Sequence, residues 1–343
     1  MTKQESQLMK GVAILLMIFY HLFDRINNTE ICDNLISIDD TPLVFILSRA
    51  ANPVAFFLIL GGYGLYKVYE KGDKHRWTRL LKLYIHYWIT LVAFVSLGHF
   101  IKPTVYPGSM LNLISNVTGY ETTYNGEMWF LLPYVILSAL APVIFRFYQR
   151  FRALTIVAAT LFIHLGTSYC ISRYGNSFWY HNYWAYNPLL VFHLLFSFSL
   201  GAMAARSHFF ERLTAKVGNY RHTSAIAWCV GGIIALVSIN CIFKYNFFYA
   251  FTIITCLLFV PMPVWIKYGL RKLGDNSMNI WMIHSWFCYY LFHDFIYSFS
   301  YPLVIFAMLT VISYICSLAV NKIAVPIERL FMPKCEALEK PIL

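Results

Sequence analysis

Charged residues are scarce in this chain. Asp, Glu, Lys and Arg make up 13% of its 343 residues, whereas hydrophobic residues make up 59%. A water-soluble domain of this length could not expose such a composition without aggregating. The sequence also lacks any polar stretch long enough for a soluble domain, and it has no Pro-rich or low-complexity linker. These absences exclude a soluble protein and predict a single transmembrane domain over residues 1–343, with no fused soluble domain.

Metal-binding motifs and internal repeats are also missing. The eight cysteines are scattered, with no CxxC pair and no spacing of Cys and His that is typical of a metal site. We therefore expect no bound metal. Neither half of the chain resembles the other, whereas many secondary transporters are built from repeated halves. This absence argues against a transporter.

Apolar runs of about 20 residues recur along the whole chain, which is the length that an α-helix needs to cross a bilayer. The strands of an outer-membrane barrel would instead give alternating stretches of about ten residues. The pattern predicts an all-α bundle of about ten transmembrane helices. We place them over residues 8–22, 43–66, 83–101, 129–147, 153–171, 188–205, 224–243, 247–266, 278–297 and 301–320.

The formal net charge of +11 comes from an uneven distribution of Lys and Arg. If the N-terminus is cytoplasmic, 22 of the 27 Lys and Arg residues fall on the cytoplasmic side of the ten predicted helices. The positive-inside rule therefore predicts that both termini are cytoplasmic. The basic charge reflects topology, and we expect membrane lipids rather than nucleic acid as partners.

The first apolar run reads KGVAILLMIFYH, from Lys10 to His21. Eleven residues at about 100° each bring both side chains to one face of a helix, about 16 Å apart. Ionisable groups at such depth are costly and usually face a cavity or a substrate path. His21 is therefore the first candidate for catalysis. The alternatives are a buried packing histidine and a snorkelling lysine.

This run and four others together resemble the membrane acyltransferase 3 family. The family shows an arginine and a histidine with ten residues between them, and here Lys10 takes the place of the arginine. Gly61 stands where the family usually has serine. We expect Gly61, Gly62 and Gly64 at close helix contacts rather than in a binding loop. The tail, PIER at residues 326–329, is similar to the family's Ile-Glu-x-Pro but lacks the proline after Glu328. The other stretches are FFLILGGYG at 56–64, RLLKLY at 79–84, EMWFLLP at 127–133 and LGDNSMNIWMIH at 273–284.

The resemblance implies an integral-membrane O-acyltransferase. Such an enzyme transfers an acyl group, most often acetyl from acetyl-CoA, to a hydroxyl of a surface polysaccharide or another lipid-linked or cell-wall glycan. It would be a multi-pass protein of the inner or plasma membrane. The alternatives are a transporter or flippase of a lipid-linked saccharide, which needs no thioester, and a glycan polymerase, for which the outer loops are short.

The family frame and the chemistry of coenzyme A indicate roles for individual residues. His21 and Lys10 are the candidates for catalysis, with His21 as a general base on a hydroxyl or as a transient acyl carrier. The CoA phosphates need cations, and Arg76, Arg79 and Lys82 lie at the predicted cytoplasmic side, although all three are also explained by the positive-inside rule. The candidates for acceptor binding are Glu127, Trp129, Ser277 and His284. For His284 a structural hydrogen bond to another helix is the stronger reading.

Overall fold

A computed structural model describes residues 1–51, 53–72, 75–217, 222–242 and 247–331. Within these residues, seven stretches are helical, long and apolar enough to cross a membrane, and the protein is a multi-pass membrane protein. They coincide with seven of the ten predicted spans. These stretches comprise α1 (Lys3–Phe23), α3 and α4 (Leu43–Ser48 and Pro53–Glu70), α5 (Arg76–Ile101), η1 and α7 (Gly126–Phe130 and Leu131–Tyr148), α8 (Ala153–Tyr174), α9 (Tyr183–Arg206) and α16 (Pro302–Phe331).

Shorter elements connect the long helices. Strands β1 (Ser37–Ile38) and β2 (Thr41–Pro42) form an antiparallel pair in which Ser37 lies opposite Pro42. The remaining elements are α2 (Ile26–Glu30), α6 (Met110–Thr118), η2 (Trp179–His181), α10 (Phe209–Val217), α11 (His222–Ile242), α12 (Tyr249–Leu257), α13 (Val264–Asp275), α14 (Ser277–Ser285), η3 (Trp286–Tyr290) and α15 (His293–Tyr297).

Two of the predicted spans are not single helices. The span 247–266 is divided because α12 ends at Leu257 and α13 begins at Val264. Pro261 and Pro263 lie between them, and proline removes a backbone donor and restricts the residue before it. A further predicted span, 224–243, falls on α11, whose apolar part is Ile226–Cys241. Residue 243 lies outside the described residues.

The span 278–297 is divided by η3, a π-helical segment in which Leu291 N–H bonds Trp286 O at 2.8 Å. Such segments are rare and are often found at functional sites. Non-helical backbone is tolerated at membrane depth where protein covers it. Here Trp286 and Cys288 are buried. The prediction of one continuous helix was therefore wrong, because hydropathy detects apolar residues but not a change of helical register.

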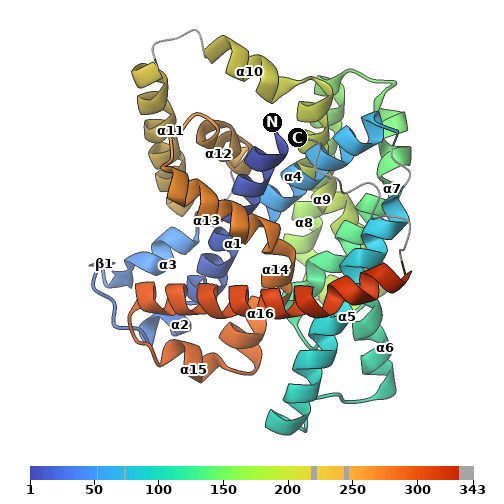
Figure 1. Cartoon of the computed structure of the whole chain (residues 1–343), viewed down its shortest axis with the longest axis vertical. Coiled ribbons are helices and arrows are strands. Elements are labelled where there is room, and N and C mark those ends of the chain that lie inside the picture. Colours follow the sequence, from blue (N-terminus) through green and yellow to red (C-terminus); the bar gives the residue numbers. More distant parts are fainter. Residues whose placement is uncertain (52, 73–74, 218–221, 243–246, 332–343) are drawn as a thin grey trace.

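Helix α1 lies in the middle of the bundle and packs against α4, α13, α14 and α16 (Figure 1). Its start follows from the sequence, because Thr2 and Glu5 form a capping box that satisfies two backbone donors. One side of the helix is then covered by its neighbours, and Ile14, Ile18 and Leu22 are fully buried. The face that carries Lys10 and His21 is therefore held inside the protein.

Glycines allow α1 and α13 to approach closely. A Cβ on Gly274 would lie 1.8 Å from Gln7 O, and a Cβ on Gly11 would lie 2.0 Å from Leu270 O. Helices α4 and α9 meet in the same way at Gly62, where a Cβ would lie 2.0 Å from Phe198 O. The expected close contact thus holds for Gly62 but not for Gly64, which has no described atom within 4 Å.

Candidate active site

Three ionisable side chains from separate parts of the chain meet near the end of α1. His21 Nδ1 lies 2.6 Å from His284 Nε2 of α14, and His21 Nε2 lies 3.1 Å from Glu127 Oε2 of η1. The two imidazole rings are nearly parallel, with 10° between their planes. The side chains of His21 and Glu127 are 10% and 16% exposed, whereas His284 is fully buried. The predicted catalytic histidine therefore lies against two of the residues predicted to bind the acceptor.

Hydrogen bonds from α14 and η3 fix the backbone that carries Glu127. Asn125 Oδ1 caps η1 by accepting from Glu127 N–H at 3.2 Å, and it also accepts from Ser285 Oγ at 3.0 Å. Trp281 Nε1 donates to Glu127 O at 3.4 Å. The hydroxyl of Tyr290 accepts a hydrogen bond from the backbone N–H of Gly126, the residue before Glu127, at 2.7 Å. The carboxylate therefore has a defined position relative to the helix that carries His284.

A rim of polar groups, which sequence reasoning missed, adjoins the three residues. The Arg25 guanidinium lies over the Tyr289 ring, 4.1 Å from its centroid, and its Nη2 is 3.9 Å from Glu127 Oε1. The Tyr289 hydroxyl lies within hydrogen-bond distance of two acceptors, Asp24 Oδ1 at 3.0 Å and His21 O. Burial raises the pKa of the Asp24 carboxyl. The only sequence signal for this rim is the polar pair Asp24-Arg25 directly after the first apolar run.

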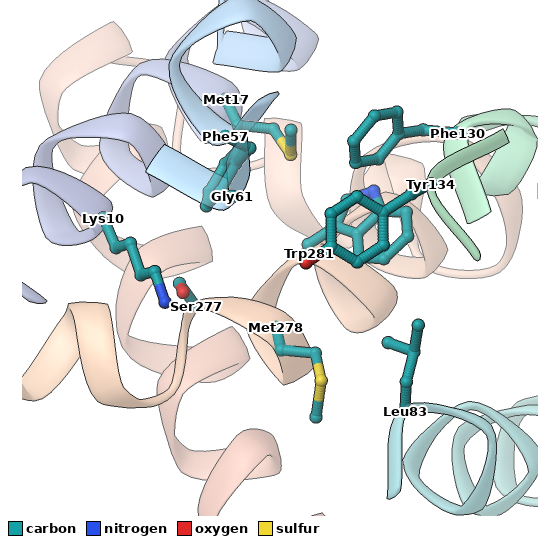
Figure 2. A pocket seen from close by; sticks show the side chains of 10 residues that line it. All are labelled: Lys10, Met17, Phe57, Gly61, Leu83, Phe130, Tyr134, Ser277, Met278 and Trp281. Atoms are coloured by element: carbon teal, nitrogen blue, oxygen red, sulfur yellow. The ribbon is translucent and has the colours of Figure 1, made fainter. Parts of the chain in front are cut away.

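Lys10 lines a cavity of about 170 Å³. Figure 2 shows the Lys10 ammonium group directed toward Ser277 at one end, and Phe130 and Trp281 at the other. Met17, which also lines the cavity, lies about one helical turn before His21. Because Trp281 bonds the backbone of Glu127, the wall of this cavity is also the support of the candidate site.

A second cavity, of about 460 Å³, is lined by three arginines, Arg76, Arg79 and Arg146. Helices α4, α5 and α7 line both cavities, each with residues four positions apart in the sequence, which is about one turn. In each pair, the first residue lines the smaller cavity and the second lines the larger. The pairs are Gly61 and Leu65, Leu83 and Arg79, and Tyr134 and Ser138. The two cavities are therefore stacked along the same three helices.

Lys82, which we predicted to bind the donor together with Arg76 and Arg79, does not line the arginine cavity. Its Nζ lies 2.9 Å from Glu328 Oε2 of α16, and His86 Nε2 lies 2.7 Å from Glu328 Oε1. The other ring nitrogen of His86 contacts α14, where His86 Nδ1 lies 2.7 Å from Asn279 Oδ1. Lys82 therefore belongs to an ionic network that joins α5, α14 and α16, because α16 crosses α5 (Figure 1).

The other two predicted acceptor residues lie apart from the three ionisable groups. Ser277 lines the smaller cavity, and its Oγ donates to Gly274 O at 2.8 Å. Trp129 packs against Phe130 with ring centroids 6.0 Å apart and lines neither of the two cavities. In the described part of the chain, no three His, Cys, Asp or Glu side chains are arranged to hold a metal ion.

The family comparison decides the class of protein. The family model described as "Acyltransferase domain" matches residues 4–322. The chain belongs to the membrane acyltransferase 3 family. No curated protein and no solved structure is significantly similar to the chain. The acyltransferase carries all of its candidate site residues within the matched range, whereas Glu328 follows it. Family membership confirms the resemblance seen in the sequence and favours an acyltransferase over a transporter, flippase or polymerase.

Proposed function

We propose that this acyltransferase transfers acetyl from acetyl-CoA to a hydroxyl of a surface polysaccharide, or of another lipid-linked or cell-wall glycan, in the inner or plasma membrane. The observation that carries the proposal is the order of groups through the bundle. Three arginines line one cavity, Lys10 enters the next, His21 and Glu127 follow, and Arg25 lies at the rim. A donor that is anionic at one end and reactive at the other fits this order.

The arginine cavity is suited to the phosphates of coenzyme A. Guanidinium groups bind phosphate oxygens with two parallel hydrogen bonds and keep their charge when partly buried. Arg76 and Arg79 are one turn apart on α5, and Arg146 reaches the same cavity from α7. With both termini in the cytoplasm, as the positive-inside rule predicts, this cavity faces the compartment that supplies acetyl-CoA.

The smaller cavity is suited to the arm of the donor. It begins beside the arginine cavity and ends at Trp281, next to the backbone of Glu127. Lys10 and His21, about 16 Å apart on α1, mark its length. A thioester reaching the His21 end would meet an imidazole and a carboxylate, which are suited to take the proton of an attacking hydroxyl. The acceptor would enter at the Arg25 rim, on the opposite side from the donor.

The proposal is tested with membranes that contain the wild-type protein or His21→Ala. We expect radiolabelled acetyl-CoA to release CoA and to label the glycan in wild-type membranes, and both signals to fall by about 10²-fold or more in His21→Ala, the size typical of a lost acid–base group. His164→Ala is the matched control, because His164 also lies within a long apolar helix but contacts His193 rather than the site. Equal labelling by His21→Ala and wild type, at equal amounts of inserted protein, would contradict the proposal.

Measuring both products also separates the donor from the acceptor. CoA release without glycan labelling would overturn the acceptor assignment alone. Labelling that requires a different acyl-CoA would overturn the choice of acetyl. A protein that moves or lengthens the saccharide without consuming any thioester would instead match the transporter or polymerase alternatives.

A further inference from the structure

The surroundings of His284 assign its proton. His284 Nδ1 lies 2.9 Å from Trp281 O and 3.1 Å from Ile280 O. Carbonyl oxygens only accept hydrogen bonds, so Nδ1 must carry the hydrogen. A second proton would place a charge on a fully buried ring beside another histidine, which is costly. His284 is therefore neutral, and its Nε2 has a lone pair.

This lone pair in turn assigns the proton on His21. His21 Nδ1 lies 2.6 Å from His284 Nε2, so it must be the donor of that hydrogen bond. If the His21 ring is neutral, its own lone pair is then on Nε2, which lies 3.1 Å from Glu127 Oε2. A lone pair and a carboxylate oxygen repel at this distance unless a proton lies between them. One proton must therefore reside on His21 Nε2 or on Glu127.

We propose that His284 is a positioning residue that keeps a proton on His21 Nδ1, so that His21 Nε2 and Glu127 together hold the one proton that acyl transfer moves. This inference rests on the proposed function. It identifies Nε2 as the reactive nitrogen of His21, and it makes Glu127 part of the acid–base pair rather than a residue that only binds the acceptor.

The proton balance of the transfer fits this pair. The acceptor O–H bond and the thioester C–S bond break, while an ester C–O bond and the S–H bond of CoA form. His21 lies about one turn beyond Met17, which lines the proposed donor cavity, so His21 Nε2 gives its proton to the leaving sulfur. Glu127 is more exposed and lies beside Arg25, so it receives the proton of the hydroxyl that enters at the rim. The pair ends the reaction with one proton, as it began.

Three substitutions of His284 test its role. The amide oxygen of Gln can take the place of Nε2 and accept from His21 Nδ1, whereas Asn is too short and Phe has no acceptor. We expect His284→Phe and His284→Asn to lower kcat by about tenfold or more with little change in the KM for acetyl-CoA, and His284→Gln to restore most of kcat. His193→Phe, which alters a stacked pair of histidines at the interface of α8 and α9, is the matched control. Equal kcat in the Gln and Phe variants, or a wild-type kcat in Phe, would overturn the proposal.

A spectroscopic measurement tests the same point without donor or acceptor. In protein labelled with nitrogen-15 histidine, the His21 signals are those lost in His21→Gln. We expect Nδ1 of His21 to be protonated in wild type and in His284→Gln. In His284→Phe we expect Nδ1 to lose its proton, which leaves Nε2 protonated beside Glu127. An unprotonated Nδ1 in wild type would overturn the tautomer assignment. Because no substrate is present, this outcome is independent of whether acetyl-CoA and a glycan are the substrates.

Discussion

Replacing Gly274 by Ala should disturb the candidate site from a distance. The new Cβ would lie 1.8 Å from Gln7 O, whereas ordinary contacts begin at 3.4 Å, so α1 and α13 would have to separate by about 1.6 Å. Overpacking of this kind typically costs about 1–3 kcal/mol of stability. His284 lies on α14, the helix that follows α13. If α14 moved with α13 by this amount, the distance between His284 Nε2 and His21 Nδ1, now 2.6 Å, would exceed hydrogen-bond distance.

Gly269→Ala is the control for this prediction, because Gly269 lies on the same helix but has no described atom within 4 Å. Alanine there should be neutral or slightly stabilising, by up to about 1 kcal/mol, from helix propensity. Thermal unfolding of the detergent-solubilised proteins and acetyl transfer in membranes would be measured for both variants. If Gly274→Ala unfolds at the same temperature as Gly269→Ala and is fully active, the close packing of α1 on α13 does not position the site.

Other substitutions separate the roles of the cations. Lys10→Arg should keep or improve activity because a guanidinium can hold a phosphate with two bonds, whereas Lys10→Ala should be impaired; full activity per inserted molecule in Lys10→Ala would show that Lys10 is only a membrane anchor. Arg79→Gln and Arg146→Gln should each raise the KM for acetyl-CoA by about tenfold, as expected for one charged hydrogen bond, with kcat nearly unchanged. Lys82→Gln should leave that KM unchanged; a rise equal to that of Arg79→Gln would return Lys82 to the donor site. Glu328→Gln should lower the unfolding temperature, because it leaves Lys82 and the buried His86 without the carboxylate that they share.

The sequence was sufficient where one helix determined the geometry. The spacing of Lys10 and His21 places both on one face of α1, and the structure has Lys10 and Met17 lining one cavity that ends near His21. Seven spans followed from hydropathy for the same reason, since each is a long apolar helix. The family motifs were also informative, because Gly11 and Gly274 belong to two of them and meet between α1 and α13.

The sequence was insufficient where distant segments meet. His21 and His284 are separated by 263 positions, and their contact depends on the short α14 and on the π-helical segment after it. Hydropathy treats that region as one continuous helix. The pairing of Lys82 with Glu328 likewise depends on how α16 crosses α5, which no local pattern specifies. Arg146 looked like any other loop cation until α7 brought it to the cavity of Arg76 and Arg79.

Helix α14 has a mechanical consequence of its own. Asn279 connects it to His86, which in turn contacts Glu328. About 7.5 Å further along the axis, His284 connects it to His21, which contacts Glu127. A helix this short behaves as a stiff rod, so a displacement at one anchor is transmitted to the other. Protonation or loss of Glu328 should therefore be sensed at the reacting nitrogen, although the two carboxyl groups never touch.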